Sequence, residues 1–220
     1  MAATTLTGPI RAPASGGAPR QLVVLLHGVG SDGNDLIQLA PYFAQVLPDA
    51  EFIAPNAPFH YDMAPSGHQW FSLQDRTASV VAAGARIAAP ILDAFLDAEL
   101  ARRGLDDDAL ALVGFSQGTM MALHVALRRP HSCAAVIGYS GALVAPESLN
   151  DEMTARPPVL LVHGKVDDVV PLEYMALAQE ILQEAGVAVY PHIRPDLGHG
   201  IDADGIAVGA VFLGQQFAEA

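Results

Sequence analysis

A serine between two glycines stands near the middle of the chain. Residues 114–118 read Gly-Phe-Ser-Gln-Gly, and they lie between an apolar run and a segment with helical pattern. The spacing matches the Gly-x-Ser-x-Gly nucleophile elbow, a strand-to-helix turn so tight that both neighbours must be glycine. Such a turn exposes the hydroxyl of Ser116 above a sheet, where it can attack a carbonyl carbon. The alternative is an ordinary glycine-rich turn, which this position between strand and helix disfavours.

A serine nucleophile of this kind needs an acid and a base further along the chain. After the last candidate acid only two histidines remain, His192 in a strand-like run and His199 between two glycines. Because flanking glycines let a loop reach over the sheet, we expect His199 to be the base. Asp167 and Asp168 follow the apolar run 159–162, and spacing alone does not choose between them.

The reaction also needs two backbone N–H donors for the negative charge that develops on the substrate oxygen. One donor is the residue after the nucleophile, here Gln117, and the other lies in an early strand-to-helix loop. Residues 26–33 read Leu-His-Gly-Val-Gly-Ser-Asp-Gly, and we expect the N–H of Val29 to be the second donor. His27 is expected to brace this loop by hydrogen bonds rather than to react.

The elements that position these residues alternate between apolar runs and helical patterns. Continuous apolar runs are typical of strands buried on both faces, so the fold class is α/β, with a mainly parallel central sheet and helices on both faces. Pro90 is expected to kink one helix or to start another. Ligands of such sheets bind beyond the carboxyl ends of the strands, where the candidates fall. The pattern predicts strands at 21–26, 51–54, 109–114, 133–139, 159–162 and 187–194, and helices at 34–47 (with Asn34 as its cap), 77–103, 119–129, 173–185 and 203–217.

Composition excludes several classes of protein. The 220 residues include 11 Lys and Arg against 24 Asp and Glu, a net charge of −13, which argues against nucleic acid and anionic membrane surfaces as partners. We find neither a run of roughly 18 apolar residues for a membrane span nor a secretory signal, so a cytoplasmic protein is expected. The single cysteine, Cys133, excludes an intramolecular disulfide and is expected to be a small buried hydrophobe.

Taken together, these segments resemble the phospholipase/carboxylesterase family of α/β-hydrolases, which includes acyl-protein thioesterases and small bacterial carboxylesterases. In this family the acid stands four residues after the histidine of a His-Gly pair and four before a proline, which implies Asp167. The resemblance likewise implies Ser116 as nucleophile, His199 as base, and Val29 and Gln117 as oxyanion donors. Thr119 departs from the glycine of many relatives. The matching motifs are residues 26–30, 69–71, 114–118, 163–171 and 198–200.

The resemblance also shapes what we expect of domains and substrate. It implies one α/β-hydrolase domain over residues 1–220, with residues 1–20 as a flexible or hairpin segment. The loop 55–76 borders the acyl pocket in the family, and from it Trp70, Phe71 and Met63 are expected to contact substrate; the alternative is core packing. The connection 141–158 is too short for a large cap, which favours an open cleft and soluble esters.

The expected function is that of a serine carboxylesterase that hydrolyses small to medium acyl esters through an acyl-enzyme. No cofactor is expected, and no metal, because the histidines lack metal-ligand spacing. Acyl-protein thioesterase or lysophospholipase activity, acyl transfer to an alcohol, and a non-catalytic ligand-binding homologue are the alternatives. The partner is a small acyl ester, and small relatives suggest a homodimer.

Overall fold

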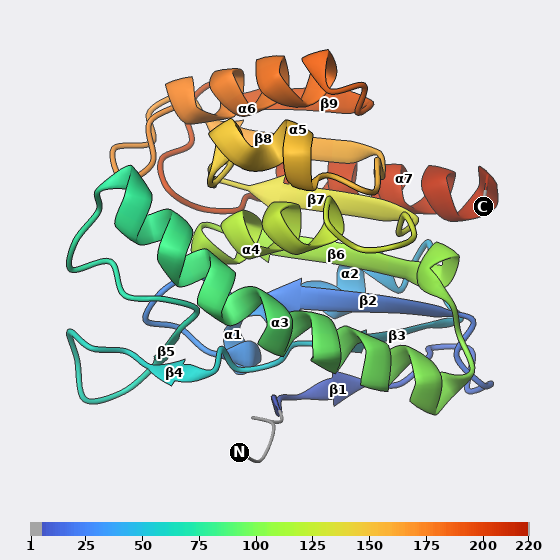
Figure 1. Cartoon of the computed structure of the whole chain (residues 1–220). Coiled ribbons are helices and arrows are strands. Elements are labelled where there is room, and N and C mark those ends of the chain that lie inside the picture. The colour runs from blue at the N-terminus through green and yellow to red at the C-terminus, as the bar shows by residue number, and fades with distance from the viewer. Residues whose placement is uncertain (1–5, 220) are drawn as a thin grey trace.

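The computed structural model describes residues 6–219, so residues 1–5 of the expected N-terminal segment lie outside the described part. Its main feature is a seven-stranded sheet of order β1-β3-β2-β6-β7-β8-β9 (Figure 1). All neighbouring strands run parallel except β1, which pairs antiparallel with β3. The strands are β1 (Ile10–Arg11), β2 (Gln21–Leu26), β3 (Ala50–Ile53), β6 (Leu110–Phe115), β7 (Ala135–Tyr139), β8 (Val159–Gly164) and β9 (Val189–Arg194). The mainly parallel sheet predicted from the sequence is confirmed.

Helices cover both faces of this sheet, and each layer seals its own core. One core lies under α3 (Ala78–Arg103), α4 (Gln117–Ala126), α5 (Leu149–Glu152) and α6 (Glu173–Glu184). The other lies under α1 (Gly33–Leu36), η1 (Ile37–Leu39), α2 (Ala40–Phe43) and α7 (Ala203–Glu219). Figure 1 shows the first layer in front of the sheet and α7 behind it. Short 3₁₀ turns, η2 (Asp107–Ala109) and η3 (Pro146–Ser148), complete the order, and residues 6–219 form no large cap domain over the sheet.

The predicted helix 34–47 is wrong in its continuity. Three short pieces, α1, η1 and α2, replace it, and the cap is Asp32 rather than Asn34: the N–H of Asn34 donates to Asp32 Oδ1 at 2.8 Å. Pro41 lies at the start of α2. Because proline has no N–H to donate, Pro41 cannot make the helical hydrogen bond back to the carbonyl of Ile37. The segment is interrupted by 3₁₀ geometry at η1, directly before this residue.

Two further differences concern α3 and the loop 55–76. Pro90 lies inside α3, which continues through it as one helix instead of starting anew. By length and composition alone this helix could cross a membrane, but Leu92, Leu96 and other residues of its buried stripe pack into the core. The loop contains a small antiparallel hairpin, β4 (Phe59–His60) and β5 (His68–Gln69).

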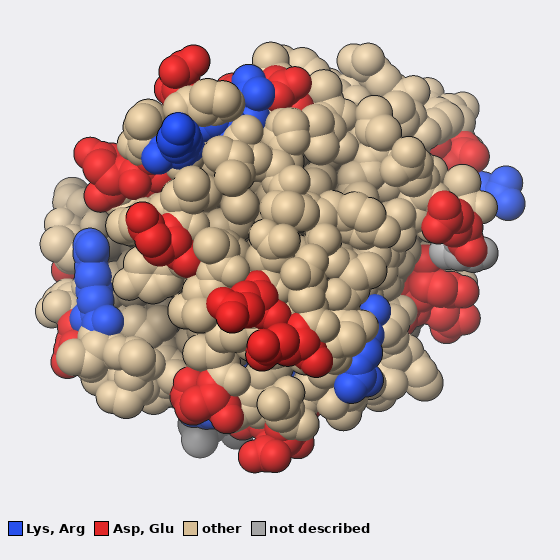
Figure 2. All heavy atoms as spheres, turned by 90° about the horizontal axis from the view of Figure 1, so that it is seen from above, with Lys and Arg blue, Asp and Glu red and all other residues tan. Residues whose placement is uncertain are grey.

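Charged side chains lie scattered over the surface. Figure 2 shows the molecule from above, with acidic groups dispersed among uncharged residues and no continuous basic patch in the part drawn in colour.

Cys133 is buried, as expected, and burial raises the pKa of its thiol to about 12. A thiol of this kind stays protonated near neutral pH and is a poor nucleophile.

Candidate active site

Ser116 occupies a strained turn between β6 and α4. Its backbone angles are φ 53° and ψ −116°, a conformation that residues other than glycine rarely adopt. A hydrogen bond from the N–H of Ser116 to the carbonyl of Tyr139 (2.9 Å) holds the turn. The start of a ten-residue helix follows at Gln117, so the positive end of the helix dipole lies beside the hydroxyl.

Glycines on both sides of this turn are required by close backbone contacts. A Cβ added to Gly118 would lie 1.8 Å from the carbonyl oxygen of Leu26, and one added to Gly114 would lie 2.4 Å from the backbone of Gly118. Both distances are far below van der Waals contact. The two glycines therefore let α4 approach β2 and β6 closely enough to turn Ser116 outward.

The structure brings Ser116, His199 and Asp167 into one hydrogen-bonded line. The Oγ of Ser116 lies 3.0 Å from Nε2 of His199, and Nδ1 of His199 lies 2.9 Å from Oδ2 of Asp167. His199 is held in the loop between β9 and α7, where its ring packs on Phe115 with centroids 5.0 Å apart. Nearby, the hydroxyl of Ser140 donates to the carbonyl of Gly200 (3.3 Å).

The Asp167 carboxylate is held in its ionised form by its neighbours. Burial raises its pKa, but hydrogen bonds from the N–H groups of Val170 (2.8 Å) and Val169 (2.9 Å), and from His199, outweigh burial and lower it overall. A carboxylate that accepts several hydrogen bonds is stabilised as an anion. Asp167 can therefore face Nδ1 of His199 with a full negative charge, which favours the tautomer whose Nε2 is free to take a proton.

The other candidate acid and the other candidate base do not take part in this hydrogen-bonded line. Asp168 is exposed in the same turn, and the contact to His199 belongs to Asp167. His192 lies on the edge strand β9, where its Nε2 is 3.0 Å from Oδ2 of Asp204. Of the two neighbouring aspartates, Asp167 is the one that contacts His199 in the described structure.

The two backbone segments that carry the expected oxyanion donors lie next to Ser116. A Cβ on Gly28 would lie 3.3 Å from Cβ of Ser116, so the loop that contains Val29 packs directly against the nucleophile. Among the described residues, no acceptor is bonded to the N–H of Val29 or of Gln117. Both groups are thus free for an oxygen atom that enters the site.

A buried network that sequence reasoning missed joins the two donor segments. The indole Nε1 of Trp70 donates to the carbonyl of His27 (3.0 Å), and the N–H of Trp70 donates to Oε1 of Gln117 (2.8 Å). In turn, Nε2 of Gln117 donates to the carbonyl of Phe71 (2.7 Å). His27 braces the loop as expected: its Nδ1 donates to the carbonyl of Gly28 (2.7 Å) and its Nε2 accepts from the N–H of Ala57.

The three residues expected at the acyl pocket take different positions. The side chain of Trp70 is 0 % exposed and that of Phe71 3 %, which is where the core-packing alternative expects them. Met63 is 63 % exposed in the turn of the β4–β5 hairpin. Of the three, only Met63 reaches the surface. No cluster of three metal-ligating side chains occurs among residues 6–219.

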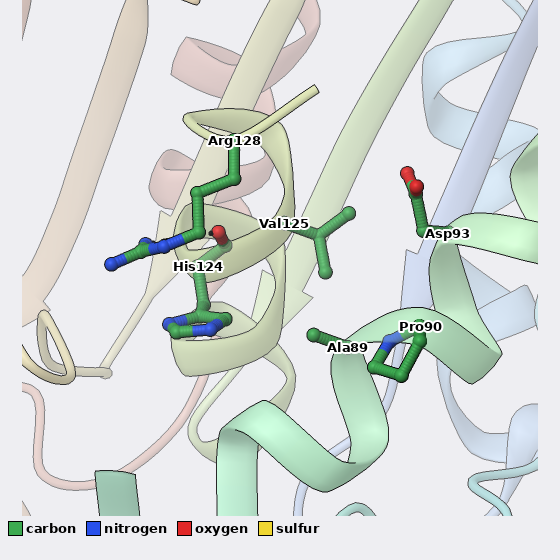
Figure 3. Close-up of a pocket in the computed structure, with 6 residues that line it drawn as sticks. All are labelled: Ala89, Pro90, Asp93, His124, Val125 and Arg128. Atoms are coloured by element: carbon green, nitrogen blue, oxygen red, sulfur yellow. Dashed lines mark hydrogen bonds between the residues drawn. The ribbon is translucent and has the colours of Figure 1, made fainter. Parts of the chain in front are cut away.

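Another histidine, His124, lies apart from Ser116, His199 and Asp167. It follows Ser116 by eight positions along α4, or about 12 Å of helix. It borders a cavity of about 100 Å³ between α3 and α4. Figure 3 shows His124 on α4 and Arg128 in the turn that follows it, across from Ala89, Pro90 and Asp93 on α3. Burial, reinforced by the positive charge of Arg128, lowers the pKa of His124 to about 4, and its Nδ1 has no partner in the described part of the chain.

Comparisons with known proteins show the family and the fold. The model of the Phospholipase/Carboxylesterase family matches residues 11–215. Esterase YpfH of Escherichia coli (strain K12) is 32 % identical over 183 residues, which cover 83 % of this chain and 77 % of that protein. Acyl-protein thioesterase 1 of Saccharomyces cerevisiae is 27 % identical over 76 % of this chain and 78 % of its own length. The crystal structure of esterase PE8 superposes with a TM-score of 0.92 at 45 % identity, over 96 % of this chain and 99 % of that one.

The pKa of His124 generates a prediction about stability. The unfolded chain takes up a proton on this histidine near pH 6.5, whereas the folded protein resists until about pH 4. The free energy of unfolding therefore falls by about 2–3 kcal/mol, after allowance for screening, as the pH is lowered from 6.5 to about 4. Urea unfolding at pH 7 and pH 4.5 should show most of this loss in the parent protein and not in the His124→Phe variant. Replacement of the exposed His131 by Phe should leave the loss in place; parallel losses in all three proteins would contradict the account.

Proposed function

The chain belongs to the phospholipase/carboxylesterase family of α/β-hydrolases, and from this we propose that it is a serine carboxylesterase that hydrolyses small to medium acyl esters. Its relatives are named esterase, carboxylesterase and thioesterase, which makes the protein a carboxylic ester hydrolase. The observation that carries the finer proposal is the hydrogen-bonded line from Ser116 through His199 to Asp167, with contacts of 3.0 and 2.9 Å.

The proposed reaction starts with attack by Ser116 on the ester carbonyl. As the bond from Oγ to the carbonyl carbon forms, Nε2 of His199 takes the hydroxyl proton, and Asp167 stabilises the imidazolium that results. The oxygen of the tetrahedral intermediate accepts hydrogen bonds from the N–H groups of Val29 and Gln117. Loss of one such donor typically raises the activation barrier by about 3–4 kcal/mol.

Collapse of this intermediate completes the first half of the cycle. The bond from carbon to the alcohol oxygen breaks, and the alcohol leaves with the proton that His199 took from Ser116. Water then attacks the acyl carbon and gives a proton to His199. The bond from this carbon to Oγ breaks, His199 returns the proton to Oγ, and the acid and free Ser116 are released. Every proton is carried by the one imidazole, so the residues of this chain supply the whole acid–base chemistry.

A second candidate is hydrolysis of thioesters. It is favoured by the match to Acyl-protein thioesterase 1, and the same three residues could serve it because the thiol leaves from the same intermediate. Two esterases match at higher identity, so we place the oxygen ester first. Comparison of kcat/KM for an ethyl ester and an S-ethyl thioester of one acyl group separates the two.

Replacement of the nucleophile is the first test. Ser116→Ala removes the oxygen that forms the acyl-enzyme, and we expect kcat for p-nitrophenyl acetate to fall by roughly four to six orders of magnitude. The matched variant Ser15→Ala, at an exposed serine, should keep the parent rate. A kcat of Ser116→Ala within tenfold of the parent value would contradict the proposal.

The neighbouring aspartates offer a second test. Asp167→Asn keeps an oxygen that can accept from Val169 and Val170 but loses the charge that favours the productive tautomer of His199, so kcat should fall by about 10⁴-fold. Asp168→Asn, one residue away and exposed, should change kcat by less than threefold. The assignment of the acid is wrong if the larger loss occurs in Asp168→Asn.

A further inference from the structure

A cavity of about 280 Å³ lies between α1, η1 and the loop that carries His199. Its walls are largely apolar, while two polar side chains stand at its exposed rim. This volume is a little below the ~300–1,000 Å³ of sites for drug-sized ligands, so it suits a small group. The lining residues are Asp35, Leu36, Gln38, Leu39, Phe115 and Ile201.

This cavity adjoins the proposed catalytic residues through Phe115. The ring of Phe115 packs on the ring of His199 with centroids 5.0 Å apart, and Ile201 follows His199 by two residues. A Cβ on Gly28 would lie 3.1 Å from the Phe115 ring and 3.3 Å from Cβ of Ser116, so ring and nucleophile flank the same stretch of backbone. One side chain thus separates the cavity from the imidazole.

The chemistry of the leaving group decides which part of an ester enters the cavity. In the collapsing intermediate the carbonyl oxygen faces the N–H groups of Val29 and Gln117, and the alcohol oxygen must lie within hydrogen-bond reach of Nε2 of His199 to receive its proton. The alcohol part therefore extends past the ring of His199, and Phe115, which packs on that ring, also lines the cavity. The acyl part must leave the carbonyl carbon in another direction.

We propose that this cavity is the subsite for the alcohol part of the ester, and that it takes a short apolar alcohol whose far end is neutral or positively charged. The inference rests on the proposed function and names the substrate class of the same site. In the step concerned, the bond from the acyl carbon to the alcohol oxygen breaks, and that oxygen takes the proton from Nε2 of His199 as it departs into the cavity.

The charge preference follows from the rim. Asp35 is exposed there and accepts a hydrogen bond from the hydroxyl of Ser31 (2.8 Å), and the carboxylate of Asp32, the cap of α1, is three residues away in the chain. None of the six described lining residues is basic. A carboxylate near the far end of the alcohol attracts a cation and repels an anion, with an effect of up to about fivefold in water at contact.

The first arm of the test changes the volume of the cavity. Leu39→Phe narrows it, and kcat/KM is measured for methyl, propyl and butyl acetate, and separately for methyl acetate, butanoate and hexanoate. We expect the advantage of longer alcohols to shrink by up to about fourfold per methylene, and the dependence on acyl length to stay as in the parent. Leu177→Phe, exposed on α6, is the matched control and should change neither series.

The second arm changes only charge and does not disturb packing. The ratio of kcat/KM for acetylcholine to that for its neutral isostere 3,3-dimethylbutyl acetate is measured in the parent and in Asp35→Asn, in which an oxygen that can accept from Ser31 remains. We expect the ratio to fall about two- to fivefold. Asp108→Asn, exposed just before β6 at the opposite end of the sheet, is the control and should preserve the ratio.

The outcomes separate this inference from the proposed function. A folded Leu39→Phe variant that keeps its alcohol-length series, or that loses its acyl-length series instead, overturns the subsite assignment. An unchanged ratio in Asp35→Asn overturns the charge preference, and this arm stands even if Leu39→Phe does not fold. Failure of the proposed function would look different, because no ester in either series would then depend on Ser116.

Discussion

The close approach of α4 to the ends of β2 and β6 is the constraint on which the site depends. A side chain at Gly118 would collide with the carbonyl of Leu26, and one at Gly114 with the backbone of Gly118. Since Leu26 and Gly114 are register partners in neighbouring strands, one steric condition places Ser116, the early loop and the helix N-terminus together. The strained φ of Ser116 is the local cost of that arrangement.

The other two groups reach this point because parallel strands end at one edge. Asp167 follows β8 and His199 follows β9, and both turns lie beyond the carboxyl ends of their strands. The buried hydrogen bonds of Trp70 and Gln117 then hold the loop that follows β2 against the start of α4. Because these supports are buried, the site is held by the core rather than by its own exposed loops.

Sequence reasoning could predict the parts that follow from local pattern. Apolar runs locate the buried strands, and the spacing around Ser116 locates the turn, because both signals are carried by adjacent residues. Periodicity does not predict that 34–47 divides into three short pieces, or that α3 continues through Pro90. The choice between Asp167 and Asp168 needed the family resemblance, and the roles of Trp70 and the Gln117 side chain depend on contacts between distant segments, which spacing does not encode.

The proposed function depends on activation of the Ser116 hydroxyl by the imidazole of His199. The most direct measurement is the rate of covalent labelling by a fluorophosphonate, with the modified peptide identified by mass spectrometry. We expect one label per chain, on Ser116, and a rate that drops by at least a hundredfold in His199→Gln. Labelling at another residue, or an undiminished rate at Ser116 in that variant, would contradict the claim.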